Sequence, residues 1–522
     1  MTTTHHEPTP DLQDARRAVL GMLLPGFSGT SAPGWLLDAA RDGLAGVVLF
    51  GHNTPDVRTT ARLTTQLHDV RADLLVTIDE EGGDVSRLEA EHGSSVPSAA
   101  ALGVVDDVAT TRAVARALGR LLASCGVDLD LAPVLDVDAP GNPVIGTRAF
   151  GDDPARVSRH GRAYVDGLHD AGVGACAKHF PGHGGTTVDS HVDLPRVTAT
   201  LDDLRRRDLV PFVDAHRADP ASAGLDAVML AHVVVPELGP GPASLEPATV
   251  ALARELGLDG PVITDALDMG AVSDGAHLGE VAVRAVEAGA DLLCLGTTAG
   301  RDDRALFEDA VQALLEAVGT GRITLERLAA SAVRTAACAA ALRARRHGAG
   351  TTRGPEAADR ALAELDEIGR CAAQAAVRAE DPAHTPHCVA APAVVDLRRR
   401  ADHAAGDRGR HVVGALRRRW PDLALHGPDQ RPTEPTGDAE HGGRPTLLLT
   451  REPPSTDADR ERAVSFVAAH PDVVVLHTGV RSAVDRWFGP TGTEGRPAVV
   501  MTHGTGRATA DAAVRLLAGD DR

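Results

Sequence analysis

The chain has 522 residues and a formal net charge of −20, with 43% hydrophobic and 24% charged residues. These values are typical of a soluble globular protein, and the length suits one large domain plus a smaller one. The acidic balance argues against a nucleic-acid partner, because phosphate binding requires a basic surface.

Nothing in the sequence predicts a membrane partner. No apolar run approaches the roughly 18 residues that a membrane helix needs. The start, MTTTHHEPTPDLQD, lacks a basic segment followed by an apolar one, as a secretion signal would have. We therefore expect a cytoplasmic protein. The six cysteines form no CxxC pair, so we interpret them as reduced and mostly buried.

The first two thirds of the chain alternate short β-branched runs with longer amphipathic stretches. This alternation is typical of βα units on a parallel sheet. The stretches between the runs predict helices, for example over 58–70 and 110–126, where apolar residues recur at three and four. The number of runs is the number of strands in a (β/α)8 TIM-type barrel, which we predict over residues 12–345. The runs are 19–24, 46–50, 73–78, 127–137, 173–180, 226–235, 261–266 and 290–296.

A second, smaller α/β pattern follows the barrel. Residues 346–390 are charged and rich in alanine, which predicts a helical linker or surface segment. Strands are predicted over 392–397, 445–450, 472–479 and 497–504, with a helix over 458–470. We expect residues 391–522 to form an αβα sandwich, with a long loop at 426–445.

Polar residues end several of the predicted barrel strands. The carboxyl-terminal strand ends of such barrels form the active-site face, so polar groups gathered there are placed for chemistry. A single one of them could instead cap the loop that follows. They are Asp79, Asp136, Lys178, His179, His232 and Asp265.

The segment KHFPGHG, Lys178 to Gly184, begins at the end of one of these strands. His179 and His183 are four residues apart, as in zinc-binding helices. Pro181 and the neighbouring glycines disfavour a helix here, so we predict a glycine-rich loop and no metal site.

The tripeptide DSH at 189–191 is a second polar unit. In an extended loop the side chains of Asp189 and His191 point to the same side. A carboxylate beside an imidazole can fix its tautomer and adjust its basicity. The pair is therefore a candidate acid/base unit, although such a tripeptide is more often structural.

Aromatic residues are scarce, with one Tyr, three Trp and eight Phe. A long polysaccharide cleft usually offers flat aromatic faces on which sugar rings stack. If the chain binds sugar, a small pocket for one terminal unit, dominated by hydrogen bonds, is easier to build.

KHFPGHG followed by DSH resembles the motif of the glycoside hydrolase family 3 β-N-acetylhexosaminidases, including the cytoplasmic enzyme of peptidoglycan recycling. The resemblance covers most of residues 15–345, and its segments follow the order of the predicted strands. The other matching segments are GVVLFGHN (46–53), IDEEGGDVSRL (78–88), DLDLAPVLDV (128–137), NPVIGTRAFG (142–151), VMLAHVVVPEL (228–238), TDALDM (264–269) and AVEAGADLLCLG (285–296).

This resemblance implies a retaining, exo-acting β-N-acetylglucosaminidase that needs no metal or organic cofactor. Asp265 corresponds to the nucleophile, His191 to the general acid/base and Asp189 to the residue that tunes it. We prefer Asp265 over Asp268 as nucleophile because Asp265 ends a strand. The residues that correspond to those holding the terminal sugar are Asp79, Arg87, Arg148, Lys178 and His179.

The implied chemistry is coherent. Retaining glycosidases usually use two carboxyl groups, and the family departs from this by using a histidine on a loop. Protonated His191 would donate to the leaving oxygen as Asp265 attacks the anomeric carbon. Neutral His191 would then activate water to release the sugar.

The sequence departs from the usual family pattern at three places. Glu80 stands where the family usually has Gln, and Asp84 where it usually has Arg. Gly185, Thr186 and Thr187 stand where acidic residues are common. The positions to which catalytic and sugar-binding roles were transferred are unchanged, but the preference for a leaving group is left open.

Other functions stay open at this point. The nearest is a β-N-acetylglucosaminide phosphorylase, because a histidine acid/base does not repel phosphate as a carboxylate would. A β-glucosidase is disfavoured by the KH, GHG and DSH set. A non-catalytic sugar-binding protein is disfavoured because both Asp265 and His191 are present. The sequence gives neither the natural aglycone nor the oligomeric state.

Overall fold

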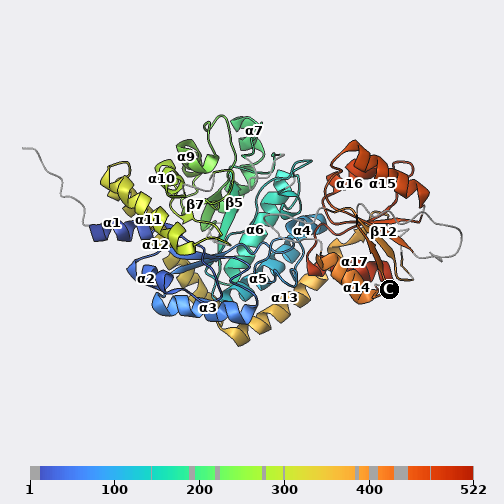
Figure 1. The fold of residues 1–522 in the computed structure, drawn as a ribbon, viewed down its shortest axis with the longest axis horizontal. Helices are drawn as coiled ribbons and strands as arrows, with labels where there is room; N and C mark the ends of the chain where they lie inside the picture. Colours follow the sequence, from blue (N-terminus) through green and yellow to red (C-terminus); the bar gives the residue numbers. More distant parts are fainter. Residues whose placement is uncertain are drawn as a thin grey trace, which may run out of the picture.

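The computed structural model describes residues 12–142, 144–186, 194–217, 224–272, 278–297, 300–381, 387–388, 390–398, 410–427, 445–470 and 472–520. The chain forms a barrel unit and a smaller α/β unit that lie side by side (Figure 1). No helix in these ranges combines the length and apolarity that a membrane crossing requires.

In the described part of the chain, each of the eight predicted runs contains one short barrel strand. Strands β2 to β7 pair in parallel in chain order, and β1 pairs with β8. Backbone hydrogen bonds continue the ring: Val48 N–H donates to Pro25 O at 3.1 Å, and Thr264 N–H donates to Leu292 O at 3.0 Å. The predicted (β/α)8 barrel is confirmed. Its strands are β1 Leu23–Leu24, β2 Gly46–Leu49, β3 Leu75–Ile78, β4 Leu129–Asp130, β5 Gly174–Phe180, β6 Ala227–Leu230, β7 Val262–Thr264 and β8 Leu293–Cys294.

Helices surround the barrel strands (Figure 1). Helix α5, for example, buries an apolar stripe that includes Val114, Leu118 and Leu121. Aspartates begin several of the helices; Asp107 accepts hydrogen bonds from the Ala109 and Thr110 N–H groups at the start of α5. The helices are α1 Leu12–Leu20, α2 Gly34–Asp42, α3 Val57–Val70, α4 Ala99–Val105, α5 Val108–Ser124, α6 Pro154–Asp170, α7 Leu201–Arg206, α8 Val210–Arg217, α9 Pro247–Glu255, α10 Leu278–Ala288, α11 Asp303–Gly319 and α12 Leu325–Ala349, with short 3-10 turns at Gly146–Arg148 and Ala243–Leu245.

The amino-terminal end of the barrel carries buried carboxylates. Asp128, Asp226 and Asp291 stand just before β4, β6 and β8, and we call them the lower aspartates. Each accepts a hydrogen bond of 2.9–3.0 Å from a backbone N–H of the preceding strand. Arginines of α12 lie against all three, so this helix closes the lower end through ion pairs. The pairs are Arg346 with Asp128, Arg345 with Asp226, and Arg334 with Asp291.

The smaller unit is an αβα sandwich, as predicted. The described part of its sheet has the order β11-β10-β12-β13-β14-β9, with β9 antiparallel to β14 and the other pairings parallel. Alternate strand residues pack on opposite faces: Val394 and Leu447 lie in one apolar cluster with α14 and α17, and Val395 and Leu448 in another with α15 and α16. The elements are β10 Ala393–Asp396, α14 Arg410–Arg419, β11 Ala424–His426, β12 Thr446–Thr450, α15 Asp457–Ala469, β13 Val474–His477, α16 Arg481–Phe488, β14 Ala498–Met501 and α17 Arg507–Ala518.

Between the units, α12 runs on to Ala349 and a second long helix, α13, covers Pro355–Ala376. Strand β9, Arg378–Ala379, then joins the sheet of the smaller unit. The sequence did not predict β9 or β11, which have two and three residues and lack a β-branched run. The domain limits at 346 and 391 stay predictions.

Candidate active site

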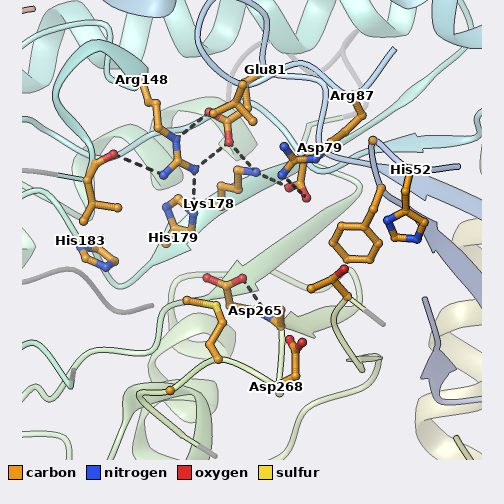
Figure 2. Close-up of a pocket in the computed structure, with 18 residues that line it drawn as sticks. His52, Asp79, Glu81, Arg87, Arg148, Lys178, His179, His183, Asp265 and Asp268 are labelled. Carbon is orange, nitrogen blue, oxygen red and sulfur yellow. Dashed lines mark hydrogen bonds and ion pairs between the residues drawn. The ribbon is translucent and has the colours of Figure 1, made fainter. Parts of the chain in front are cut away.

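A cavity of about 430 Å³ opens at the carboxyl-terminal ends of the barrel strands. Figure 2 shows the lining side chains around one shared space. The volume is in the range of pockets that hold one small ligand. The lining residues are Phe50, Gly51, His52, Asp79, Glu81, Val85, Arg87, Val144, Arg148, Lys178, His179, His183, Asp265, Ala266, Asp268, Met269, Gly270 and Thr297.

One side of the cavity is a chain of ion pairs formed by Asp79, Lys178, Glu81 and Arg148, which we call the ion-pair wall. Lys178 Nζ lies 2.6 Å from Asp79 Oδ1 and 2.7 Å from Glu81 Oε1. Arg148 Nε and Nη2 donate to the two Glu81 oxygens at 2.8 and 2.7 Å. The Lys178 side chain is 2% exposed and Glu81 7%. Groups held this firmly can meet ligand hydroxyls without rearranging first.

Opposite charges keep the ion-pair wall ionised. Burial alone would raise the pKa of Glu81, but the Arg148 guanidinium and the Lys178 ammonium hold that pKa well below its usual range. Burial would lower the pKa of Lys178, and the carboxylates of Asp79 and Glu81 outweigh it, so this pKa lies above its usual value. Glu81 and Lys178 therefore both stay charged at neutral pH.

The end of β5 and the loop after it each bring one histidine to the cavity, His179 and His183. His179 Nδ1 donates to Asp136 Oδ2 at 2.7 Å, and the His183 backbone N–H donates to Asp136 Oδ1 at 2.7 Å. His179 Nε2 then faces Arg148 Nη2 at 3.4 Å. Burial lowers the pKa of His183 to about 4, although Asp136 opposes this, so His183 is neutral at pH 7.

The predicted loop at this place is confirmed, because β5 ends at Phe180 and residues 181–186 form turns. In the described parts of the chain, no group of three or more His, Cys, Asp or Glu residues could hold a metal ion. The nitrogen of His179 nearest to Asp136 is instead occupied by that carboxylate.

Asp265 follows β7 directly. Its backbone N–H donates to Leu230 O of β6 at 3.1 Å, and its Oδ1 accepts from the Ala266 N–H at 2.8 Å. Figure 2 shows the Asp265 carboxylate across the cavity from the ion-pair wall. A carboxylate fixed in this position can attack a ligand that the wall holds.

Asp268 lies three residues further on, in the turn after β7, and lines the same cavity. Its side chain is 7% exposed and is paired with Arg301. Burial raises the pKa of Asp268 to about 6, against the opposing effect of Arg301. The position of Asp268 outside the strand agrees with the prediction.

Most of the site residues predicted from the sequence meet at this cavity. Arg87 also reaches it, with Nη2 3.7 Å from Asp79 Oδ2. Asp189 and His191 lie outside the described residues, so the acid/base unit stays a prediction. The described chain reaches Thr186, whose hydroxyl lies 2.9 Å from His183 Nδ1 beside the cavity. The predicted residues around the cavity are Asp79, Arg87, Arg148, Lys178, His179 and Asp265.

Glu81 is a site residue that the sequence analysis missed. It bridges Arg148 and Lys178, so the ion-pair wall depends on it. A signal was present: residues two apart in extended chain share a side, so the acidic run after β3 predicts that Asp79 and Glu81 lie together. Their basic partners come from distant segments and gave no such signal.

Comparisons with known proteins find relatives of this chain. The family "Glycosyl hydrolase family 3 N terminal domain" matches residues 37–338. A beta-hexosaminidase of Thiobacillus denitrificans is 40% identical over 258 residues, which are 48% of this chain and 70% of that protein. Beta-hexosaminidase A of Pseudoalteromonas piscicida is 33% identical over 323 residues, 57% of this chain. The match covers 53% of that relative, so the chain spans about half its length.

The fold comparison extends over both units. A solved glycoside hydrolase family 3 beta-N-acetylglucosaminidase from Paenibacillus sp. str. FPU-7 has a TM-score of 0.76 and 28% sequence identity. The superposition covers 97% of this chain and 96% of that one. The likeness thus includes the sandwich unit, which lies outside residues 37–338.

Proposed function

Because the chain belongs to glycosyl hydrolase family 3 and is a glycoside hydrolase, we propose that it removes terminal β-linked N-acetylglucosamine from small glycosides. The named activities of its relatives support this substrate class. A role in recycling cell-wall fragments goes with the proposal and rests on the resemblance of the KHFPGHG and DSH segments.

The observation that carries the proposal is the placement of Asp265. Its carboxylate is fixed at the end of β7 and faces the ion-pair wall across a cavity of about 430 Å³. The strand end is where barrel enzymes place reacting groups. One sugar ring held against the wall brings its anomeric carbon toward this carboxylate.

The wall and its neighbours are suited to bind a terminal sugar. The Asp79 carboxylate can accept hydrogen bonds from ring hydroxyls, while Lys178, Arg148 and Arg87 can donate to hydroxyl or acetamido oxygens. His179 is oriented by Asp136 and completes this set. Scarce aromatic side chains are consistent with recognition by hydrogen bonds.

The proposed reaction has two steps and retains the anomeric configuration. The Asp265 carboxylate attacks the anomeric carbon while protonated His191 donates its proton to the leaving oxygen, and a glycosyl-Asp265 ester forms. Neutral His191, with Asp189 as its partner, then takes a proton from water. That water attacks the anomeric carbon and frees Asp265.

The test is release of p-nitrophenol from p-nitrophenyl β-N-acetylglucosaminide, measured with and without phosphate and with analysis of the sugar. We expect free N-acetylglucosamine at a rate independent of phosphate. Sugar 1-phosphate and strong stimulation by phosphate would replace the proposal with a phosphorylase. Absence of release, with turnover of the β-glucoside, would reassign the substrate.

A further inference from the structure

The loop after β3 has two sides. Asp79, Glu81 and Arg87 face the cavity, whereas Asp84, on the same loop, faces the sandwich unit. The Asp84 side chain is 1% exposed and lies 2.7 Å from Nη2 of Arg451. A carboxylate so deeply buried depends on that cation, because an unpaired charge there would be very costly.

The partners of Asp84 come from both units. Its Oδ1 accepts from the backbone N–H and the hydroxyl of Thr505, at 2.6 and 2.8 Å. Its Oδ2 accepts from the Thr147 hydroxyl at 2.5 Å, and Arg451 also donates to that hydroxyl at 3.0 Å. Arg451 is fixed in turn by a hydrogen bond to Thr478 O at 3.2 Å. Asp84, Thr147, Arg451 and Thr505 form one network, which we call the clamp.

On the sandwich side, the clamp stands at the carboxyl edge of a parallel sheet. Arg451 follows β12, and Thr505 lies between β14 and α17. Open α/β sheets bind their ligands at this edge. Here the position is filled by a carboxylate of the barrel, and the backbones approach so closely that a Cβ at Gly506 would lie 3.0 Å from Gly83 O.

On the barrel side, the clamp adjoins the cavity residues in sequence. Asp84 is three residues from both Glu81 and Arg87, and Thr147 is next to Arg148. Glu81 and Arg148 bind each other on the cavity side of the same two segments. One arginine of the sandwich thus ties together the two segments that supply opposite halves of this ion pair.

We propose that Arg451 is a positioning residue for the sugar pocket: through Asp84 and Thr147 it fixes the segments that carry Glu81, Arg87 and Arg148. The sandwich unit therefore contributes to substrate binding without reaching the cavity in the described structure. The use of a glycoside as readout rests on the proposed function. The positioning itself is a property of the unliganded chain.

A separate contact holds the two units together when the clamp is changed. Arg507 of α17 lies 2.8 Å from Asp366 of α13 and donates to Ser95 at 2.6 Å. Ser98 also donates to His503 O. Removal of Arg451 should loosen the loop at the cavity while the units stay docked.

The experiment compares Arg451→Met, Asp84→Asn and the double variant on p-nitrophenyl β-N-acetylglucosaminide. Arg418→Met is the matched control, because Arg418 forms an exposed pair with Asp511 in the same unit. We expect each clamp variant to raise KM about ten-fold with a smaller fall in kcat, since small misplacements of binding groups weaken binding strongly. The KM of the double variant should be no higher than that of either single variant. The control should have the KM and kcat of the parent.

A structural role alone would give a different result. Partial unfolding lowers the amount of active enzyme, so kcat would fall in proportion to folded protein while KM stays unchanged. This result would overturn the proposal. Additive effects of the two substitutions on KM would also overturn it. If Arg451→Met does not fold, Thr505→Val removes one hydroxyl and keeps the backbone N–H. It should raise KM about three-fold by the same mechanism, and an unchanged KM would count against the clamp.

Hydrogen exchange separates this proposal from the proposed function. In Arg451→Met without ligand, we expect faster exchange in peptides covering 79–88 and 144–148, and unchanged exchange in peptides from β6. That readout holds even if the parent enzyme fails to hydrolyse the glycoside, in which case only the proposed substrate is wrong. Unchanged exchange in both peptides would overturn the positioning role.

Discussion

The two ends of the barrel bury the same kinds of residues but arrange them differently. At the lower end, Asp291 is paired with Arg254, Arg327 and Arg334, and its side chain is fully buried. At the upper end, the charges of the ion-pair wall line a cavity. Charge that is saturated by protein stabilises a fold, whereas charge that faces a cavity can bind a ligand. Burial and ion pairing alone therefore do not identify a site.

The largest effect should come from Asp265→Asn, which breaks the upper end. Loss of the attacking carboxylate should reduce kcat by about 10³-fold or more, equivalent to about 4 kcal/mol of activation free energy. Thermal unfolding should stay close to the parent, because Asn has nearly the same size and keeps an oxygen that can accept from the Ala266 N–H. Initial rates on p-nitrophenyl β-N-acetylglucosaminide and a melting curve test both parts. Turnover equal to that of the parent would refute the assignment of Asp265 as the nucleophile.

Asp291→Asn, at the lower end, should have the opposite effect: it should lower stability and leave activity unchanged. It leaves three partly exposed arginines without the fully buried carboxylate that they share, so the free energy of unfolding should fall by about 3 kcal/mol. Denaturant unfolding measures this, and kcat/KM per folded molecule should not change. Arg322→Ala is the control, because its pairs with Glu280 and Glu287 are exposed and should contribute no measurable stability. A loss of activity in folded Asp291→Asn would contradict the division between the two ends.

Lys178→Met tests whether the wall binds substrate. Asp79 and Glu81 would lose their shared cation, and we expect kcat/KM to fall about 100-fold as hydrogen bonds to charged groups are lost. The unfolding transition should also move, since a buried pair is broken. An unchanged kcat/KM would mean that the wall is structural, like the lower end.

Glu80→Gln should give the smallest effect and one that depends on pH. Burial raises the pKa of Glu80 from 4.5 to about 7. The folded state thus favours the protonated acid. The contribution of Glu80 to the stability of the fold is fully present below pH 4.5 and is lost as the pH rises through about 7. Gln keeps the neutral form, so the variant should be more stable than the parent by roughly 2 kcal/mol at pH 8 and nearly equal at pH 5. Melting curves at both values test this, and an equal gain at pH 5 would contradict it.

The sequence was sufficient for the parts that depend on local pattern. Each barrel strand lies in an apolar run because these strands are buried, and Asp79, Lys178 and Asp265 were found because polar residues at the run ends mark the edge of the sheet. The short strands β9 and β11 have no such run and were missed.

Pairings across long separations could not be predicted. Arg148 meets Glu81 across 67 residues, and Arg451 meets Asp84 across 367. Asp84 departs from the usual family pattern, and the sequence alone gives no reason for this departure. The structure supplies one, because this carboxylate binds the sandwich unit.

The most direct test of the account is to trap and locate the sugar on the enzyme. The enzyme would be treated with the 5-fluoro analogue of N-acetylglucosaminyl fluoride, digested, and the peptide 255–284 fragmented by mass spectrometry. We predict one sugar ester on Asp265 and none on Asp268. An ester on Asp268, or no ester together with a product of inverted configuration, would contradict the assignment of Asp265 as the nucleophile of a retaining glycosidase.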